Sequence, residues 1–198
     1  MTVVVPGESL KLALRWSRRI LFAMAALAVG YCGFVLLDAW IFQQRQARNL
    51  ELPLPAVSSP SPREPGAALG GLIGRIEVAR VGLSAMVVEG TDDATLRRAA
   101  GHIRGTTVPG QPGNIGIAAH RDTFFRPLRN VRVNDIVTLT TLKGEYRYRV
   151  VSTRVVSPDE VSVLNSTGEE ILTLVSCYPF YFVGPAPNRF IVRAERVV

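Results

Sequence analysis

The sequence TLVSCYPF occupies residues 173–180 and contains one of the two cysteines of the chain. It completes an apolar, β-favouring run from Ile171 to Val175, and the aromatic and proline residues behind Cys177 must leave the strand. A strand end holds a thiol firmly while the loop behind it leaves one side open, so this position suits a nucleophile. Taken alone, Cys177 fits a buried structural cysteine better, because free cysteine is among the most buried residue types. Its neighbours must decide between the two roles.

The composition allows one domain of ordinary size and an appendage. The chain has 198 residues, of which 47% are hydrophobic, and a formal net charge of +7. Basic chains often bind nucleic acid, but here the arginines are scattered along alternating strands rather than clustered or interleaved with stacking aromatics. We therefore expect no nucleic-acid partner. A basic exterior that faces acidic lipid headgroups or cell-wall polymer accounts for the same charge.

The cysteines and histidines predict neither a disulfide nor a metal site. Cys32 lies in an apolar segment that we expect inside a membrane, so it cannot pair with Cys177 in a folded domain. His102 and His120 are far apart in the sequence and lack the short paired spacing of structural zinc ligands. We expect a free thiol at Cys177, no metal and no cofactor.

The N-terminal segment predicts a membrane anchor. Four basic residues between positions 11 and 19 precede an uncharged stretch at 20–37, and apolar character resumes after Asp38 through Phe42. This segment is long enough to span a bilayer and longer than the apolar region of a cleaved signal peptide. It also lacks an Ala-x-Ala cleavage site at its end. By the positive-inside rule, residues 1–19 form a cytoplasmic tail. We therefore expect a single-pass anchor at 20–42 in the cytoplasmic (inner) membrane, with everything after Phe42 on the extracytoplasmic face.

A linker and a β-rich domain are expected after the anchor. Residues 43–71 become polar and then Pro- and Ser-rich, which predicts a partly extended spacer. The folded domain is expected at 72–198, with a capped helix at 94–100 that ends at Gly101. The strands predicted from apolar alternation and turn residues are 73–81, 85–88, 115–120, 135–142, 145–156, 171–177 and 189–198. Many short strands with few helices predict an all-β, closed antiparallel barrel.

Two further residues are candidates for chemistry beside Cys177. His120 ends its predicted strand as Cys177 ends its own, so both side chains can lie at one end of the barrel. A histidine near a cysteine can trade its proton, which favours a thiolate and later supplies a proton to a leaving amine. A hydrogen-bonded histidine at the barrel rim is the alternative. His102, between Gly101 and Ile103 in a predicted turn, fits a structural role better.

Arg189 opens the last predicted strand, directly after the loop that Cys177 begins. A guanidinium there can donate to the oxyanion of a tetrahedral intermediate or to the carbonyl groups of a peptide substrate. An ordinary surface arginine is the alternative. Arg193 is the rival for this role, but it lies four residues further along, roughly a dozen Å away.

Together these motifs resemble the sortase family of cysteine transpeptidases. The matches are TLVSC at 173–177 against the family's Thr-Leu-x-Thr-Cys signature, AAHRD at 118–122 and NRFIV at 188–192. The resemblance covers residues 73–198, and the stretches 105–114 and 122–128 are similar to class D or E members, particularly those of Gram-negative bacteria. One departure is Ser176, where the family usually has threonine. It predicts weaker packing or an altered substrate contact rather than inactivity.

The resemblance implies a closed eight-stranded β-barrel with short helices, preceded by a transmembrane helix. It implies that Cys177 attacks a Thr–Gly-type or Thr–Ala-type bond in an LPxTG-like sorting motif of a secreted protein and forms a thioester. An amine from a cell-wall precursor, a pilin lysine or a similar acceptor would then resolve the thioester. His120 would be the general acid and base, and Arg189 the oxyanion or substrate-positioning donor.

Two alternatives remain open from the sequence. A cysteine peptidase that only hydrolyses the motif would use the same nucleophile, acid and oxyanion donor. A catalytically inactive barrel in the cell envelope that binds a peptide or a partner would lack one of the three residues in the folded site.

Overall fold

The computed structural model describes residues 7–51, 71–182 and 184–197. These divide into two compact parts, 1–41 and 42–198, and each is described by itself. The described residues of the first part belong to helix α1 (Gly7–Glu51), which within Lys11–Leu50 is long and apolar enough to cross a membrane. The helix continues through residues 43–51, the start of the predicted linker, because these are good helix formers and the first proline comes at Pro53. The remainder of the predicted linker, 52–70, lies outside the described residues.

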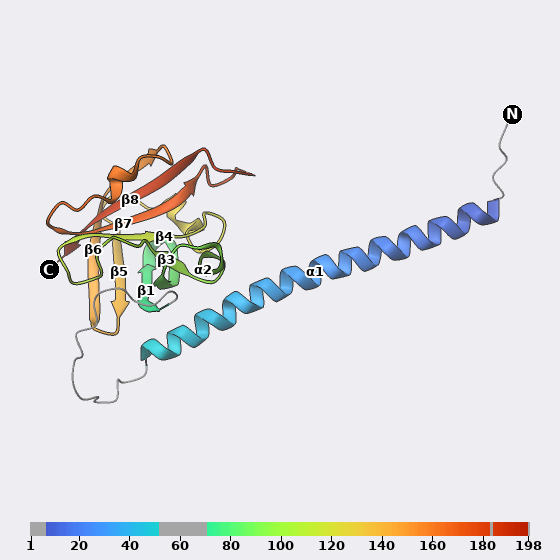
Figure 1. Cartoon of the computed structure of the whole chain (residues 1–198), viewed down its shortest axis with the longest axis horizontal. Helices are drawn as coiled ribbons and strands as arrows, with labels where there is room; N and C mark the ends of the chain where they lie inside the picture. The colour runs from blue at the N-terminus through green and yellow to red at the C-terminus, as the bar shows by residue number, and fades with distance from the viewer. Residues whose placement is uncertain (1–6, 52–70, 183, 198) are drawn as a thin grey trace. The chain divides into compact units, whose positions relative to one another are not determined.

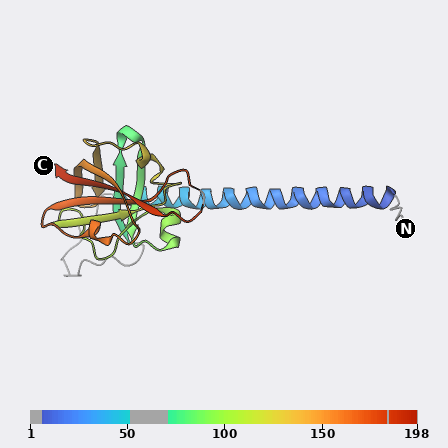
Figure 2. The same ribbon diagram turned by 90° about the horizontal axis from the view of Figure 1, so that it is seen from above.

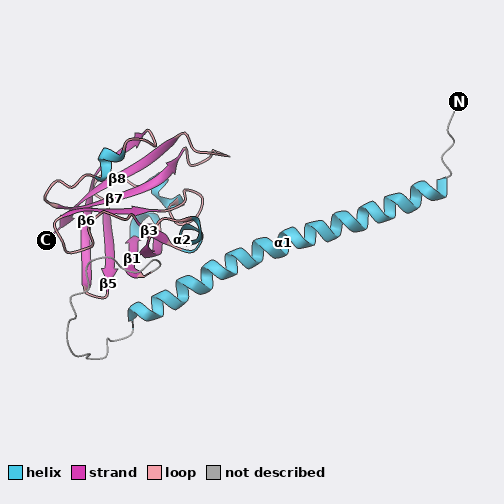
Figure 3. Ribbon diagram, viewed as in Figure 1, coloured by secondary structure: helices cyan, strands magenta, loops and turns pink. Residues whose placement is uncertain are grey.

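The second part is a β-barrel with a few short helical turns (Figures 1 and 3). Its strands are β1 (Leu72–Val78), β2 (Leu83–Glu89), β3 (Ala100–His102), β4 (Gly113–Ala118), β5 (Ile136–Thr141), β6 (Gly144–Val156), β7 (Glu170–Tyr178) and β8 (Asn188–Val197). The helical elements are η1 (Ala79–Val81), α2 (Asp93–Arg98), η2 (Arg126–Asn130) and η3 (Val161–Leu164). The predicted strand at 73–81 therefore ends earlier, at Val78, because residues 79–81 form the helical turn η1.

The strands close into a barrel in the order β1-β2-β3-β4-β7-β8-β6-β5. The predicted eight-stranded closed barrel is correct, but the prediction that it is antiparallel throughout is wrong. The pairs β2–β3 and β4–β7 are parallel. Helix α2 provides the crossover from β2 to β3, and the chain from β4 to β7 passes through β5 and β6 first, which gives both pairs the long connection that parallel strands need. The turned view in Figure 2 shows β7 and β8 side by side, in agreement with their antiparallel pairing.

Alternate side chains of each strand fill the barrel. In the sheet around β7 the inward residues are Ile115, Ile117, Ala119, Leu172, Leu174, Val192 and Ala194, all of them in the hydrophobic core. In β6 the inward residues Tyr148 and Val150 are fully buried. The Tyr148 hydroxyl donates a 2.6 Å hydrogen bond to Glu170, and burial beside this carboxylate raises the pKa of Tyr148. The alternation therefore separates a core face from an outer face, and the outer face carries the candidate site.

The segment after α2 departs most from the sequence prediction. The helix is capped, as predicted, and the cap is Asp92, whose carboxylate accepts the Thr95 N–H at 3.0 Å; this contact lowers the pKa of Asp92. The helix ends at Arg98, however, and residues 100–102 form strand β3. Gly101 is needed there for close packing rather than as a helix terminator, since a Cβ at this position would collide with the carbonyl oxygen of Gly90.

Candidate active site

Strands β7 and β8 place the candidate nucleophile opposite the candidate arginine. Their antiparallel register pairs Cys177 directly with Arg189, and Thr173 with Arg193. Residues that pair directly in a sheet project from the same face. The sequence could give only the order of these residues along the chain, whereas the register makes Cys177 and Arg189 neighbours. Arg193 lies four residues further along β8, about 13 Å away.

His120 approaches Cys177 from the other side. Strand β4 runs parallel to β7 with Ala118 beside Val175, and the Ala119 N–H continues the ladder by donating to the Val175 carbonyl at 3.2 Å. Two parallel strands advance by the same distance per residue. His120 is two residues past Ala118 and Cys177 is two residues past Val175, so we infer that His120 lies level with Cys177. The nucleophile therefore lies between the extension of β4 and the first residues of β8.

The three residues share the outer face of the barrel. Ala119, Ser176 and the core residue Val192 point inward, so His120, Cys177 and Arg189 have the opposite orientation, and all three are half-buried. Among the described residues, neither the His120 ring nor the Cys177 thiol has a hydrogen-bond partner. The Arg189 Nη1 donates to the carbonyls of Ala186 at 3.3 Å and Asn188 at 3.1 Å. A thiol, an imidazole and a guanidinium on one accessible face can perform nucleophilic attack, proton transfer and oxyanion stabilisation.

Ser176 acts inside the barrel rather than on the substrate face. It is buried, and its hydroxyl donates to the Ala119 carbonyl at 3.2 Å, next to His120. The side chain thus bridges the segments that carry His120 and Cys177. The expected alternative of an altered substrate contact does not fit this orientation.

A hollow of about 310 Å³ lies further along the same outer face. It is lined by Ser152, Arg154, Glu160, Ser162, Val163, Thr173, Ile191 and Arg193. Arg193, the rival of Arg189 in the sequence analysis, is therefore part of a concave wall. The sequence prediction missed this hollow, because its lining comes from three strands and from η3.

A buried hydrogen-bond network fixes one wall of the hollow. The Asn114 Oδ1 accepts a 2.7 Å hydrogen bond from Thr173, and its Nδ2 donates to the carbonyls of Val163 at 3.0 Å and Asn165 at 3.3 Å. One side chain on β4 thereby ties η3 to β7. No local sequence signal marks Asn114 for this role, since its partners are 49 to 59 residues away.

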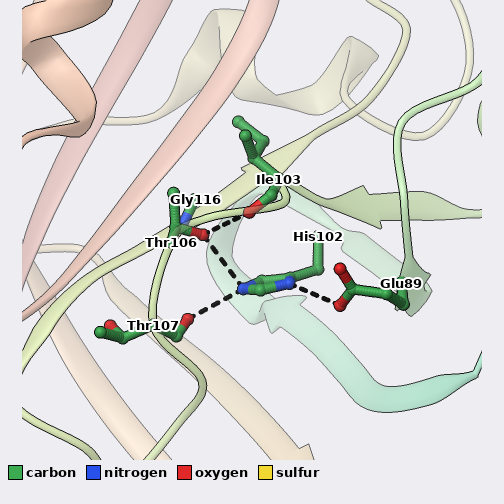
Figure 4. Close-up of polar contacts among 6 residues, drawn as sticks. All are labelled: Glu89, His102, Ile103, Thr106, Thr107 and Gly116. Atoms are coloured by element: carbon green, nitrogen blue, oxygen red, sulfur yellow. Dashed lines mark hydrogen bonds and ion pairs between the residues drawn. The ribbon is translucent and has the colours of Figure 1, made fainter. Parts of the chain in front are cut away.

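His102 has a structural role, although its predicted turn is in fact strand β3. Figure 4 shows its ring between Glu89 on one side and the loop residues Thr106 and Thr107 on the other. Its Nδ1 lies 2.7 Å from the Glu89 carboxylate, and its Nε2 donates to the Thr107 carbonyl at 2.8 Å. Both ring nitrogens are thus occupied, and both residues are buried, with exposed fractions of 2% for His102 and 7% for Glu89.

The described residues contain no group of three or more His, Cys, Asp or Glu side chains that could hold a metal ion. Both cysteines are free thiols.

A family model for the sortase domain matches residues 76–197, nearly the whole barrel. The chain belongs to the sortase family. Sortase D of Bacillus subtilis (strain 168) is 31% identical over 191 residues, which cover 89% of this chain and 96% of that protein. The family and the fold show a cysteine transpeptidase.

Solved sortase structures have the same fold. The Clostridium perfringens Sortase D5 transpeptidase matches this sortase with a TM-score of 0.61 and 26% identity, covering 78% of this chain and 88% of that one. Sortase A of Listeria monocytogenes matches with a TM-score of 0.60 and 30% identity, covering 65% and 88%. The relatives named sortase D agree with the class D resemblance found in the sequence. The similarity to class E and to Gram-negative members stays a prediction.

Proposed function

We propose that this sortase is anchored in the cytoplasmic membrane, cleaves an LPxTG-like sorting motif through a thioester on Cys177, and transfers the acyl group to an amine. His120 accepts the thiol proton and returns it to the leaving amine. Arg189 donates hydrogen bonds to the oxyanion of the tetrahedral intermediate or to the carbonyl groups of the peptide. The acyl group leaves when the amine of a cell-wall precursor, a pilin lysine or a similar acceptor attacks the thioester.

The strand register carries this proposal. It pairs Cys177 with Arg189 across β7 and β8, and the β4–β7 pairing, which ends at Ala118 and Val175, puts His120 level with Cys177 when it is extended by two residues. A thioester mechanism needs a nucleophile, a proton carrier and an oxyanion donor on one open face, and these three residues meet that requirement.

The hollow on the same face supports a peptide substrate that lies along the barrel. Thr173 at its floor is four residues before Cys177 on β7, or about 13 Å. An extended peptide covers that distance in about four residues. With its scissile carbonyl at Cys177, a sorting motif would place its first residues in the hollow, where Val163 and Ile191 offer apolar contacts and Arg154, Glu160 and Arg193 offer polar ones.

The direct test uses the full-length chain in detergent micelles. A small panel of LPxTG-like peptides is incubated with and without a glycine peptide as the amine, and the protein is analysed by mass spectrometry. We expect an acyl adduct on Cys177 and an amide product that requires the amine. Cleavage that releases only the free acid, even with excess amine, would favour the hydrolase. Neither cleavage nor an adduct with any peptide would favour the inactive binding barrel.

The anchor supports the proposed location. Helix α1 is apolar and long enough to span a membrane, and basic residues precede its apolar stretch. This predicts residues 1–19 inside, the span at 20–42, and the linker at 43–71 and the barrel at 72–198 outside. Protease added to intact spheroplasts should digest the linker or the barrel. Full protection until the cells are lysed would contradict this orientation.

A further inference from the structure

Arg121, the residue after His120, binds the loop that follows Cys177. Its guanidinium donates to three carbonyl oxygens, at 2.9 Å to Pro179, 2.7 Å to Phe182 and 2.8 Å to Gly184. Its Cζ also lies 5.8 Å from the centroid of the Phe182 ring. Such a planar fork holds several acceptors in fixed directions, whereas the three donors of a lysine ammonium rotate about a single nitrogen. One side chain therefore satisfies backbone groups that are 58 to 63 residues away in sequence.

The loop that Arg121 binds joins the two strands of the active site. It leaves β7 directly after Cys177 and Tyr178 and enters β8 at Asn188 and Arg189. Near its end, the Ala186 carbonyl accepts a hydrogen bond from the Arg189 Nη1 at 3.3 Å. The position of this carbonyl helps to determine where the Arg189 guanidinium points. A loop that shifts would therefore turn Arg189 away from its neighbour Cys177.

We propose that Arg121 is a positioning residue that holds the β7–β8 loop so that the loop orients Arg189 beside Cys177. The inference rests on the proposed role of Arg189 as a donor to the reacting carbonyl. Arg121 is assigned no step in the chemistry, because three of its five N–H donors, including both on Nη2, bind the loop carbonyls. Oxyanion stabilisation depends on donors that are already in place when the charge develops, so a poorly held Arg189 lowers the rate of the chemical step.

The test is a double-mutant cycle on kcat with the full-length chain in detergent micelles and one LPxTG-like peptide at saturation. The variants are Arg121→Ala, Arg189→Ala and the double variant. Misplacing a catalytic group by about 1 Å can cost on the order of 100-fold, so we expect Arg121→Ala to lower kcat by about 10-fold to 100-fold. Because Arg121 acts through Arg189, the double variant should lie within about twofold of Arg189→Ala alone.

Two further variants separate positioning from general stability. Arg129→Ala is the matched control, since Arg129 contacts the Tyr181 ring of the same loop, with 5.3 Å between its Cζ and the ring centroid, and has no hydrogen bond to the loop residues that the structure describes. Its kcat should stay within about twofold of the parent. Arg121→Lys keeps the charge but not the fork, and it should recover only part of the lost kcat. If Arg121→Ala does not fold, the same cycle is run with Arg121→Lys.

A parental kcat for Arg121→Ala would overturn the inference, and so would a double variant whose loss equals the product of the two single losses. In both cases the proposed function would stand as long as Arg189→Ala is slow. A parental kcat for Arg189→Ala would overturn the assigned role of Arg189 and this inference with it, whereas the adduct on Cys177 would test the thioester separately.

Discussion

The two histidines of this sortase differ in position and in what they contact, since His102 is the last residue of β3 and His120 lies two residues past the end of β4. His102 is buried, and both of its ring nitrogens have partners, Glu89 and Thr107. His120 is half-buried on the outer face of the barrel, and among the described residues its ring has no hydrogen-bond partner. A buried histidine whose two nitrogens are both held by protein groups stabilises the fold but cannot reach a substrate to exchange a proton. A histidine with open nitrogens beside a free thiol can.

The same contrast extends to the surroundings of each histidine. The polar groups around His102 satisfy one another within the protein, as buried polar groups must. Around Cys177, the polar groups of Arg121 and Ser176 are used to hold backbone segments in place, and the thiol itself is left open. We therefore expect changes in the first region to act on stability, and changes in the second to act on rate.

The largest expected effect is that of Cys177→Ala. The substitution removes the proposed nucleophile from a strand end and only a few atoms of packing, so peptide cleavage should be abolished while the fold is kept. Mass spectrometry after incubation with the peptide should find an acyl adduct on the parent and none on the variant, with circular dichroism as the control for folding. An adduct on the variant would rule out Cys177 as the nucleophile.

The two histidines should differ sharply when each is replaced by alanine. His102→Ala leaves the buried carboxylate of Glu89 without its partner, which should cost about 3–5 kcal/mol of stability. The melting temperature should fall by about 10 °C or more. His120→Ala should leave the melting temperature nearly unchanged and lower kcat/KM by about 10²-fold to 10⁴-fold. If His102→Ala proved as stable as the parent while its activity was lost, the contrast between the two regions would be wrong.

The two outward arginines of β8 allow a finer test within the active-site region. Arg189→Ala should cost about 2–4 kcal/mol of transition-state stabilisation, the range for a single oxyanion donor, and Arg189→Lys should restore part of it. Arg193→Ala should leave kcat near that of the parent and act only on KM, since Arg193 lines the hollow opposite Thr173. The measurement is kcat and KM on one sorting peptide. A large fall in kcat for Arg193→Ala, with Arg189→Ala near the parent, would place the reacting carbonyl at Arg193.

The smallest expected effect is a pH-dependent one, away from both histidines. The Arg80 guanidinium hydrogen-bonds to Asp135 and lowers the pKa of this carboxyl group. A carboxylate with a lowered pKa stabilises the fold above its unfolded pKa of about 3.9, and this contribution is lost as pH falls through the folded pKa. Asp135→Asn should therefore lower the melting temperature at pH 7, and its difference from the parent should shrink below about pH 4.

The exposed Asp159 supplies the control for that measurement. Asp159→Asn changes the same group on the barrel surface and should not reproduce the pH-dependent difference. A constant difference between Asp135→Asn and the parent from pH 7 to pH 3 would show that the ion pair with Arg80 is not its source.

The sequence alone was enough to find most strands and all three proposed catalytic residues. Strand alternation is a local property, so Tyr148 and Val150 could be assigned to the core face of β6 before the structure was known. Cys177, His120 and Arg189 could be selected because each stands where a predicted strand meets a loop and belongs to a sortase-like motif. The closed barrel could be inferred for the same reason, from the number and length of its strands.

The tertiary structure was needed wherever the partners are far apart in the chain. Local patterns do not encode register, so only the folded barrel pairs Cys177 with Arg189, brings His120 level with Cys177, and makes two strand pairs parallel. Strand β3 has only three residues and forms because it pairs with β2 and β4, so the local sequence at 100–102 predicted a helix end and a turn instead. Arg121 could not be distinguished from the other arginines of the chain, because the carbonyls that it binds are brought to it by the closure of the barrel.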